Sequence, residues 1–203
     1  MTAKRVSAGA IALLVLGALV LRIWLRMDQQ DETLGQAIWA LYRFFTIWTN
    51  TLVGVVAACV AIGQKPTASL QTGLLLSISI VAIVYHALLA KFNDYAGLDW
   101  VADHLVHTVI PLAYAVYWLM FVRKSQLRLS QLPYWLILPL VYCIFAMTRG
   151  ALDGVYPYFF LNLADLGFAR TALNVFGLLV AFAGIGAVLV FAGRALHRVG
   201  SSD

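Results

Sequence analysis

The 203-residue chain has 63% hydrophobic and 11% charged residues and a mean hydropathy of +0.87, which excludes a water-soluble globular protein. Its net charge of +5 comes from Lys and Arg residues scattered at the ends of apolar segments, which argues against a nucleic-acid partner. Because a spanning helix uses about 20 residues, six of them would take up roughly 120 residues and leave only short connections. We therefore expect an all-α polytopic membrane protein that forms a single transmembrane domain over residues 1–203.

Six apolar segments follow one another along the chain and predict six transmembrane helices. They cover residues 6–25, 38–62, 71–90, 100–122, 133–149 and 170–193. Charged connections or connections containing Gly or Pro separate them. Most Trp and Tyr residues lie near segment ends, as in the aromatic belts of membrane proteins. The sequence therefore predicts a six-helix bundle.

Six crossings place both termini on the same side of the membrane, and the positive charges indicate which side. Eight Lys and Arg residues fall on the side of the termini and five on the opposite side. The eight are Lys4, Arg5, Lys65, Arg123, Lys124, Arg128, Arg194 and Arg198, and the five are Arg22, Arg26, Lys91, Arg149 and Arg170. Because cytoplasmic connections carry the excess of Lys and Arg, we expect both termini in the cytoplasm.

Polar side chains within the second predicted span follow a helical spacing. Arg43, Thr46 and Asn50 are separated by three and then four residues, which puts them on one face of a continuous helix. If this helix begins near Ile38, Thr46 lies about 12 Å along it from the outer side, at 1.5 Å per residue. Ionisable groups within spans cost several kcal/mol unless they line a cavity or find partners, so each is a candidate functional group.

The fourth predicted span carries a matching polar face. Asp103 and His107 are four residues apart, and His104 comes three residues before His107. His107 lies about 10 Å from the outer end of its span, close to the depth of the hydroxyl in the second span. His86, near the outer end of the third span, and Arg149, at the outer end of the fifth, fall in the same layer. Four spans therefore direct polar groups to one level.

A threonine hydroxyl beside an imidazole is a combination suited to nucleophilic catalysis. Thr46 would be the nucleophile, His107 its base, and Asp103 a group that orients the imidazole. Other interpretations stay open, because a membrane Thr commonly bonds a carbonyl of its own helix and an Asn commonly joins neighbouring helices. Arg43 and Arg149 lie near span ends, from where Arg side chains commonly extend to the lipid headgroups.

Three alternatives use the same polar layer differently. His86, His104, His107 and Asp103 would together supply ligands to a zinc ion, with its bound water as the nucleophile. His86 and His107 would instead bind a haem between the third and fourth spans. In a non-catalytic lipid-binding or transport protein, the layer would bind a lipid without reacting with it.

The connection between the last two predicted spans, residues 150–169, is rich in aromatic and apolar residues. It is too short to span the membrane and too apolar for a solvated loop. We therefore expect a lid or re-entrant segment over the outer mouth, with Tyr156, Asn162 and Asp165 facing the cavity.

Three motifs carry a resemblance to a known family. FFTIWTN (Phe44 to Asn50), DHLVHTVIP (Asp103 to Pro111) and VYPYFFLNLADLG (Val155 to Gly167) resemble, in this order, the androgen-induced and androgen-dependent TFPI-regulating protein family, especially its short bacterial members. The animal members are intramembrane threonine hydrolases that cleave esters between a fatty acid and a hydroxy fatty acid. The resemblance implies that Thr46 is the essential threonine and His107 the essential histidine. Animal members have Asn where the second motif begins with Asp.

These features predict an intramembrane hydrolase of lipid esters in a bacterial plasma membrane, with its site in the extracytoplasmic half. Thr46 and His107 are the expected catalytic pair. The expected substrate-binding or supporting residues are Arg43, Asn50, His86, Asp103, His104, Arg149 and Tyr156. Among them, an Arg would bind a free carboxylate of the substrate and the Asn would help hold an oxyanion. We expect no metal or other cofactor, and a membrane lipid as the partner.

Overall fold

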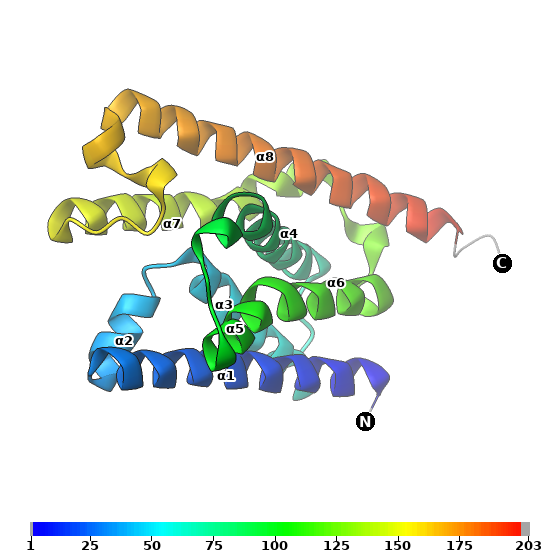
Figure 1. The fold of residues 1–203 in the computed structure, drawn as a ribbon. Helices are drawn as coiled ribbons and strands as arrows, with labels where there is room; N and C mark the ends of the chain where they lie inside the picture. Colours follow the sequence, from blue (N-terminus) through cyan, green and yellow to red (C-terminus); the bar gives the residue numbers. More distant parts are fainter. Residues whose placement is uncertain (1, 200–203) are drawn as a thin grey trace. The chain divides into compact units, whose positions relative to one another are not determined.

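The computed structural model describes residues 2–199, with side chains described for residues 2–196. Throughout these residues the regular secondary structure is helical (Figure 1). The chain forms two compact units, Met1–Arg123 and Lys124–Asp203, each with its own set of helices.

The first unit is built from α-helices, two of which are extended by π-helical turns. Its elements are α1 (Ala3–Gln30), α2 (Leu34–Leu41), α3 (Phe45–Ala61), α4 (Ala68–Val84), the π-turn η1 (Tyr85–Leu89), the 3₁₀ turn η2 (Ala90–Phe92), α5 (Gly97–His104), the π-turn η3 (Leu105–Val109) and α6 (Ile110–Phe121). The π-turns continue their neighbours, so that α4, η1 and η2 form one helical rod and α5, η3 and α6 form another. Both rods are long enough to cross a bilayer.

Within the described residues, five helices have the length and hydropathy of membrane spans. They are Ala3–Gln30, Ala68–Phe92, Gly97–Phe121, Leu129–Asp153 and Leu163–Leu196. The pair α2 and α3 makes a sixth if the two helices count as one span. The expected all-α fold with several apolar helices that could span a membrane is therefore confirmed at this level.

The second predicted span, residues 38–62, is not one continuous helix. The axes of α2 and α3 meet at 101°, with residues 42–44 between them. Phe44 is extended (φ −97°, ψ 134°), and its carbonyl accepts N–H groups from the first turn of α3. The break contains neither Gly nor Pro, so no residue type in the sequence predicted it. The expectation that Arg43 shares a helical face with Thr46 is therefore wrong, because Arg43 lies in the bend before α3.

In the first unit, α1 and α3 pack closely against each other. A Cβ atom on Gly54 would lie 2.8 Å from Val15 Cγ1, so only glycine permits this approach without a shift of the valine. Near the start of α1, Arg5 Nε donates to the carbonyl of Ala61, the last residue of α3, at 2.9 Å. The start of α1 thus lies beside the end of α3, and the two helices run antiparallel.

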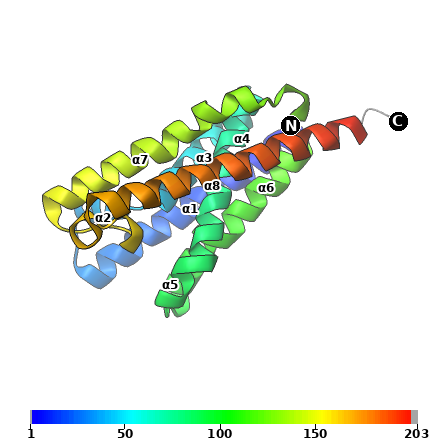
Figure 2. The same cartoon turned by 90° about the horizontal axis from the view of Figure 1, so that it is seen from above.

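The second unit contains two long helices, α7 (Leu132–Asp153) and α8 (Leu163–Val199), preceded by the 3₁₀ turns η4 (Lys124–Gln126) and η5 (Leu129–Gln131). The long helices lie side by side and antiparallel in both views (Figures 1 and 2). α7 ends at Gly154, which adopts the left-handed conformation (φ 74°) that costs glycine little. The 3₁₀ turn η6 (Phe159–Leu161) lies in the connection to α8.

Residues 150–169, predicted as a lid or re-entrant connection, include the end of one long helix and the start of the next, and their role over an outer mouth stays a prediction. α7 continues to Asp153 and α8 begins at Leu163, seven residues before the predicted span, with a bend at Gly167 (φ 71°, ψ 166°). Only residues 154–162 connect the two helices. Asn162 caps α8, because its Oδ1 accepts the backbone N–H groups of the next turn at 3.1 and 3.3 Å.

Candidate active site

Thr46 is the second residue of α3, directly after the break. Its Oγ1 lies 3.2 Å from His107 Nε2, and both residues are only 8% exposed. A threonine further inside a helix can donate to the carbonyl four residues back, as Thr49 and Thr51 do here. For Thr46 that carbonyl belongs to Tyr42, which lies in the break and accepts an indole N–H instead. The break therefore leaves the Thr46 hydroxyl directed at the imidazole.

The partners of His107 determine its tautomer. His107 Nδ1 lies 3.1 Å from the backbone carbonyl oxygen of Asp103 and 3.2 Å from Asp103 Oδ1. Both atoms are acceptors, so Nδ1 carries the hydrogen and the neutral imidazole has its lone pair on Nε2. This lone pair faces the Thr46 hydroxyl, which is the arrangement that a general base requires.

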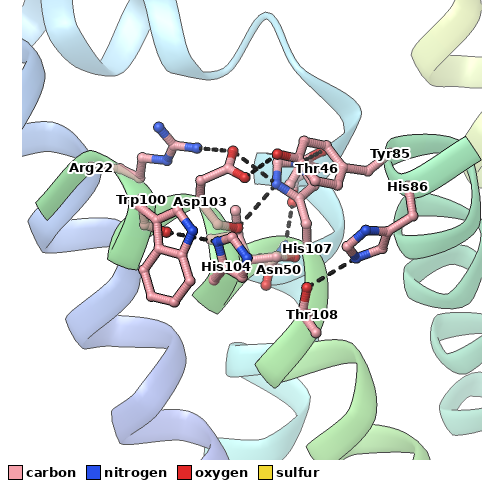
Figure 3. A network of polar contacts seen from close by, with 11 residues as sticks. Arg22, Thr46, Asn50, Tyr85, His86, Trp100, Asp103, His104, His107 and Thr108 are labelled. Atoms are coloured by element: carbon pink, nitrogen blue, oxygen red, sulfur yellow. Dashed lines mark hydrogen bonds and ion pairs between the residues drawn. The ribbon is translucent and has the colours of Figure 1, made fainter. Parts of the chain in front are cut away.

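Asp103 is 2% exposed, and both of its carboxylate oxygens have partners (Figure 3). Oδ1 accepts from Arg22 Nη2 at 2.8 Å in addition to His107, and Oδ2 accepts from the Tyr85 hydroxyl. The three residues around this carboxylate come from α1, η1 and η3. A buried carboxylate is costly in a membrane protein, and the Arg22 ion pair offsets part of that cost.

The two π-turns lie against each other at the site. Tyr85 of η1 stacks on His107 of η3, with ring centroids 3.8 Å apart and planes 9° from parallel. The next residues also meet, because His86 Nε2 lies 3.0 Å from Thr108 Oγ1 (Figure 3). A π-turn inserts one residue into a helix and is often found at functional sites. Here the paired π-turns bring the imidazole and the phenol ring face to face.

Asn50 joins α3 to the second π-turn. Its Nδ2 donates to the carbonyl of Thr46 at 2.8 Å and to the carbonyl of Val106 at 3.2 Å. Both amide hydrogens are therefore engaged by backbone oxygens. The expected role of Asn50 in holding an oxyanion does not fit this arrangement.

Pro111 explains why the π-turn needs Asn50. In η3 the N–H of Ile110 donates to the carbonyl of Leu105. The next N–H in this register would belong to Pro111, which has none, so the Val106 carbonyl lacks a backbone donor. The Asn50 amide supplies that donor from the neighbouring helix.

Two other predicted site residues of the first unit lie outside the Thr46–His107 contact. His104 Nδ1 donates to the carbonyl of Trp100 at 3.0 Å, and the two rings stack with centroids 3.9 Å apart. Arg43 is half-buried in the bend between α2 and α3.

Arg149 and Tyr156 belong to the second unit. Arg149 is buried, and its Nε donates to Asp153 Oδ2, one turn later in α7, at 3.3 Å. Tyr156 packs on the backbone of α7, because a Cβ atom on Gly150 would lie 2.4 Å from its ring. Their predicted roles toward a substrate stay predictions.

Each histidine of the described region has a different bonding partner. Between residues 2 and 196, no group of three or more His, Cys, Asp or Glu side chains is arranged to hold a metal ion. His86 bonds Thr108, His104 bonds the Trp100 carbonyl, and His107 bonds Asp103. The zinc alternative therefore lacks a ligand set in this part of the chain.

No family model, curated protein or solved structure matches this chain. The family resemblance of the three motifs thus stays an expectation.

A polar cavity of about 340 Å³ lies beside the site in the first unit. Its lining includes Tyr85 and Asp103, together with His86, Asp94 and His104. The same carboxylate therefore contacts His107 and borders a space large enough for several water molecules.

Arg22 and Tyr85 are the site residues that the sequence did not indicate. Arg22 lies 81 residues before Asp103, at the end of a span where a basic residue is typical of an interfacial position. Tyr85 lies near the end of an apolar segment, where a tyrosine is typical of the aromatic belt. The signal for Tyr85 is its place directly before His86, one turn from the end of an apolar segment.

Proposed function

We propose that this protein is an intramembrane hydrolase of lipid esters that uses Thr46 as nucleophile and His107 as general base. One observation carries the proposal, namely the buried chain of contacts from Thr46 Oγ1 through the His107 ring to the Asp103 carboxylate. Each of the two contacts spans 3.2 Å, which is within the reach of a hydroxyl, a base and its orienting group before substrate binds.

The reaction takes place in two steps. Thr46 Oγ1 attacks the ester carbonyl carbon while His107 Nε2 takes the hydroxyl proton, and collapse of the tetrahedral intermediate breaks the bond to the alkoxide, which leaves with that proton. Water then attacks the acyl-threonine, His107 takes a proton from the water and returns it to Thr46 Oγ1, and the fatty acid leaves. Asp103 stabilises the imidazolium in both steps, and the polar cavity beside it supplies the water.

We propose that the start of α3 supplies an oxyanion donor. The first N–H groups of an α-helix have no carbonyl partner four residues back within the helix. The N–H groups of Ile47 and Trp48 donate to the Phe44 carbonyl, so the proposed donor of this first turn is the N–H of Thr46 itself. This N–H and the positive end of the helix dipole stabilise the negative charge that develops on the carbonyl oxygen. The break between α2 and α3 leaves Thr46 at a helix start.

The substrate class comes from the resemblance to the androgen-induced and androgen-dependent TFPI-regulating protein family. We propose fatty acid esters of hydroxy fatty acids or similar lipids, with Arg43 binding a free carboxylate. We also propose that both termini are cytoplasmic, and that the site lies in the extracytoplasmic half of a bacterial plasma membrane.

The test compares two valine substitutions in purified protein. Thr46→Val removes the hydroxyl that faces the imidazole, and we expect it to lower kcat by about 10³-fold or more, as loss of a nucleophile does. Thr49→Val is the matched control, because the Thr49 hydroxyl bonds only carbonyls of its own helix. Hydrolysis of a p-nitrophenyl ester and of a fatty acid hydroxy-fatty-acid ester gives the rates. Intact mass spectrometry detects the acyl adduct, which Thr46→Val should abolish.

Activity that survives both Thr46→Val and His107→Ala would overturn the proposal. So would an unchanged adduct in Thr46→Val.

The broken second span favours one other function, that of a lipid-binding or transport protein. Helix breaks with a helix start directed at an anionic group are typical of transporter binding sites. A purified protein that retains a stoichiometric acyl lipid but never releases its hydrolysis products would support this alternative.

A further inference from the structure

We propose that Arg22 and Tyr85 are positioning residues that hold the Asp103 carboxylate and, through it, the reactive orientation of His107. This inference rests on the proposed hydrolase function. It gives α1 a role in catalysis beyond that of a membrane anchor.

Arg22 is distinguished from its neighbour on the same helix. Its side chain is 15% exposed and reaches Asp103 at 2.8 Å, whereas Arg26, one turn later, pairs with Glu32 at 2.7 Å and is 36% exposed. The guanidinium of Arg22 also lies 5.6 Å from the centre of the Tyr95 ring, which limits its movement. Of these two arginines, Arg22 is thus the one that faces the site.

The guanidinium of Arg22 has two physical effects on the carboxylate. It neutralises a charge that would otherwise be unpaired in a buried place. It has only donors, so it requires an acceptor at Asp103 Oδ1, and the same oxygen accepts from His107 Nδ1. Arg22 therefore favours the tautomer in which Nδ1 carries the hydrogen and the lone pair of Nε2 faces Thr46.

Tyr85 contacts both partners of the Asp103–His107 pair. Its hydroxyl donates to Asp103 Oδ2, and its ring lies parallel to the His107 ring at 3.8 Å. The hydroxyl limits rotation of the carboxylate, and the ring limits tilting of the imidazole. The two contacts can be separated, because Tyr85→Phe removes the hydroxyl and keeps the ring.

The experiment measures kcat, KM and thermal stability for matched pairs of variants. We expect Arg22→Met to lower kcat between about tenfold and a hundredfold with little change in KM, the size of effect that misplacement of a catalytic group produces. Tyr85→Phe should lower kcat by a smaller factor. Arg22→Lys keeps a positive donor and should recover part of the loss, which a purely structural role would not predict.

Arg26→Met and Tyr117→Phe are the controls. Arg26 lies on the same helix as Arg22 and pairs with Glu32, beyond the end of that helix. Tyr117 donates its buried hydroxyl to Oε1 of Gln71, and Gln71 lies 14 residues before Tyr85 on the helical rod of α4. Both controls should keep the kcat of the wild type.

The outcomes separate this inference from the proposed function. Wild-type protein without activity, or Thr46→Val with full activity, would remove the hydrolase itself. An active wild type with unchanged kcat in both Arg22→Met and Tyr85→Phe would overturn the positioning role alone. A loss in Arg22→Met that Arg22→Lys does not reduce, with unfolding at lower temperature, would also count against it.

Discussion

At the scale of single residues, the position of a threonine within a helix decides what its hydroxyl does. Thr46 and Thr49 both lie in α3 and are both buried. Thr49 has helical residues before it, so its hydroxyl donates to the carbonyls of Phe45 and Thr46. Only one residue of α3 precedes Thr46, and the carbonyl four positions back lies in the break, so its hydroxyl is left to contact His107. A hydroxyl that donates to a carbonyl of its own helix is not available to a base. The break removes that carbonyl for Thr46, so its hydroxyl stays available to His107.

Asp103 gives a prediction about charge and geometry. Asp103→Asn keeps an acceptor for His107 only if the amide oxygen takes the place of Oδ1. Arg22 favours this orientation, because its guanidinium has only donors and would repel the amide NH₂ group at that position. We expect Asp103→Asn to lower kcat by about tenfold, which is about 1.4 kcal/mol of transition-state stabilisation. Asp103→Leu, which removes every acceptor, should lower kcat by about 10³-fold. Steady-state kinetics with both variants check the difference.

Asp99→Asn is the control for this prediction. Asp99 lies on the same helix, α5, and its carboxylate accepts from Gln29. Equal losses in Asp103→Asn and Asp103→Leu would show that the charge, and not the acceptor at Oδ1, determines the rate.

The sequence predicted the residues whose types are rare in spans and missed those whose types are common at span ends. Thr46, Asp103 and His107 stood out because a buried hydroxyl, carboxylate or imidazole needs a partner in lipid. Arg22 and Tyr85 did not stand out, because Arg, Lys, Trp and Tyr are enriched at membrane interfaces for reasons unrelated to any site. Their contacts join segments far apart in the chain, whereas helical spacing relates only residues within the same helix.

At the scale of elements, the π-turn η3 depends on a side chain from another helix. Proline at position 111 removes the donor that the Val106 carbonyl would use, and Asn50 replaces it. A buried carbonyl without a partner costs about 1–3 kcal/mol. The π-turn that carries His107 is therefore stabilised from α3, the helix that carries Thr46.

This dependence predicts a suppressor. Asn50→Leu should destabilise the protein by about 1–3 kcal/mol, because the Val106 carbonyl loses its donor. Adding Pro111→Ala restores a backbone N–H at the required position, so the double variant should recover part of the stability lost. Thermal unfolding in detergent measures the three variants, with Thr49→Val as a control in which the carbonyls keep their helical partners. An Asn50→Leu/Pro111→Ala protein no more stable than Asn50→Leu would contradict this account of η3.

The break between α2 and α3 was not predictable from apolar patterning. Residues 38–62 have the hydropathy of one span, and the bend contains no helix-breaking residue type. Across the break, the Trp48 indole N–H donates to the Tyr42 carbonyl at 2.8 Å. Composition was sufficient to predict that helices form here, but hydropathy did not contain the contact that spans the bend.

At the scale of the whole molecule, alternation of helix direction explains why the site forms in one layer of the first unit. Arg22 lies near the end of α1, Thr46 at the start of α3, Tyr85 just after α4, and Asp103 near the end of the short helix α5 that begins the next rod. Helices that alternate in direction bring the end of one and the start of the next to the same side of a membrane. The order of the apolar segments led us to expect Thr46 and His107 at one level, whereas the positions of Arg22 and Tyr85 beside them were not predicted.

Two topologies differ in the part that α2 and α3 play. If α2 and α3 formed a re-entrant loop, five crossings would place the termini on opposite sides. α3 has 17 residues, about 25 Å at 1.5 Å per residue, and its last residue lies beside Arg5 at the start of α1. This contact is the one expected if α3 crosses the membrane, which is the basis of the prediction of six crossings.

We therefore predict that both termini face the cytoplasm and that the connection of residues 93–96 faces outward. Reporter fusions measure this directly, with a fluorescent protein that matures only in the cytoplasm and a phosphatase that is active only outside it. Fusions at residue 1, at Lys65 and after residue 203 should fluoresce, and a fusion at Asp94 should show phosphatase activity. The excess of Lys and Arg on the side of the termini gives the physical reason. A fluorescent fusion at the N-terminus together with phosphatase activity at the C-terminus would instead indicate five crossings, and phosphatase activity at Lys65 would locate the missing crossing in α3. In that case Ala61, at the end of α3, would lie outside while Arg5 lies in the cytoplasm, which would contradict the 2.9 Å contact between them.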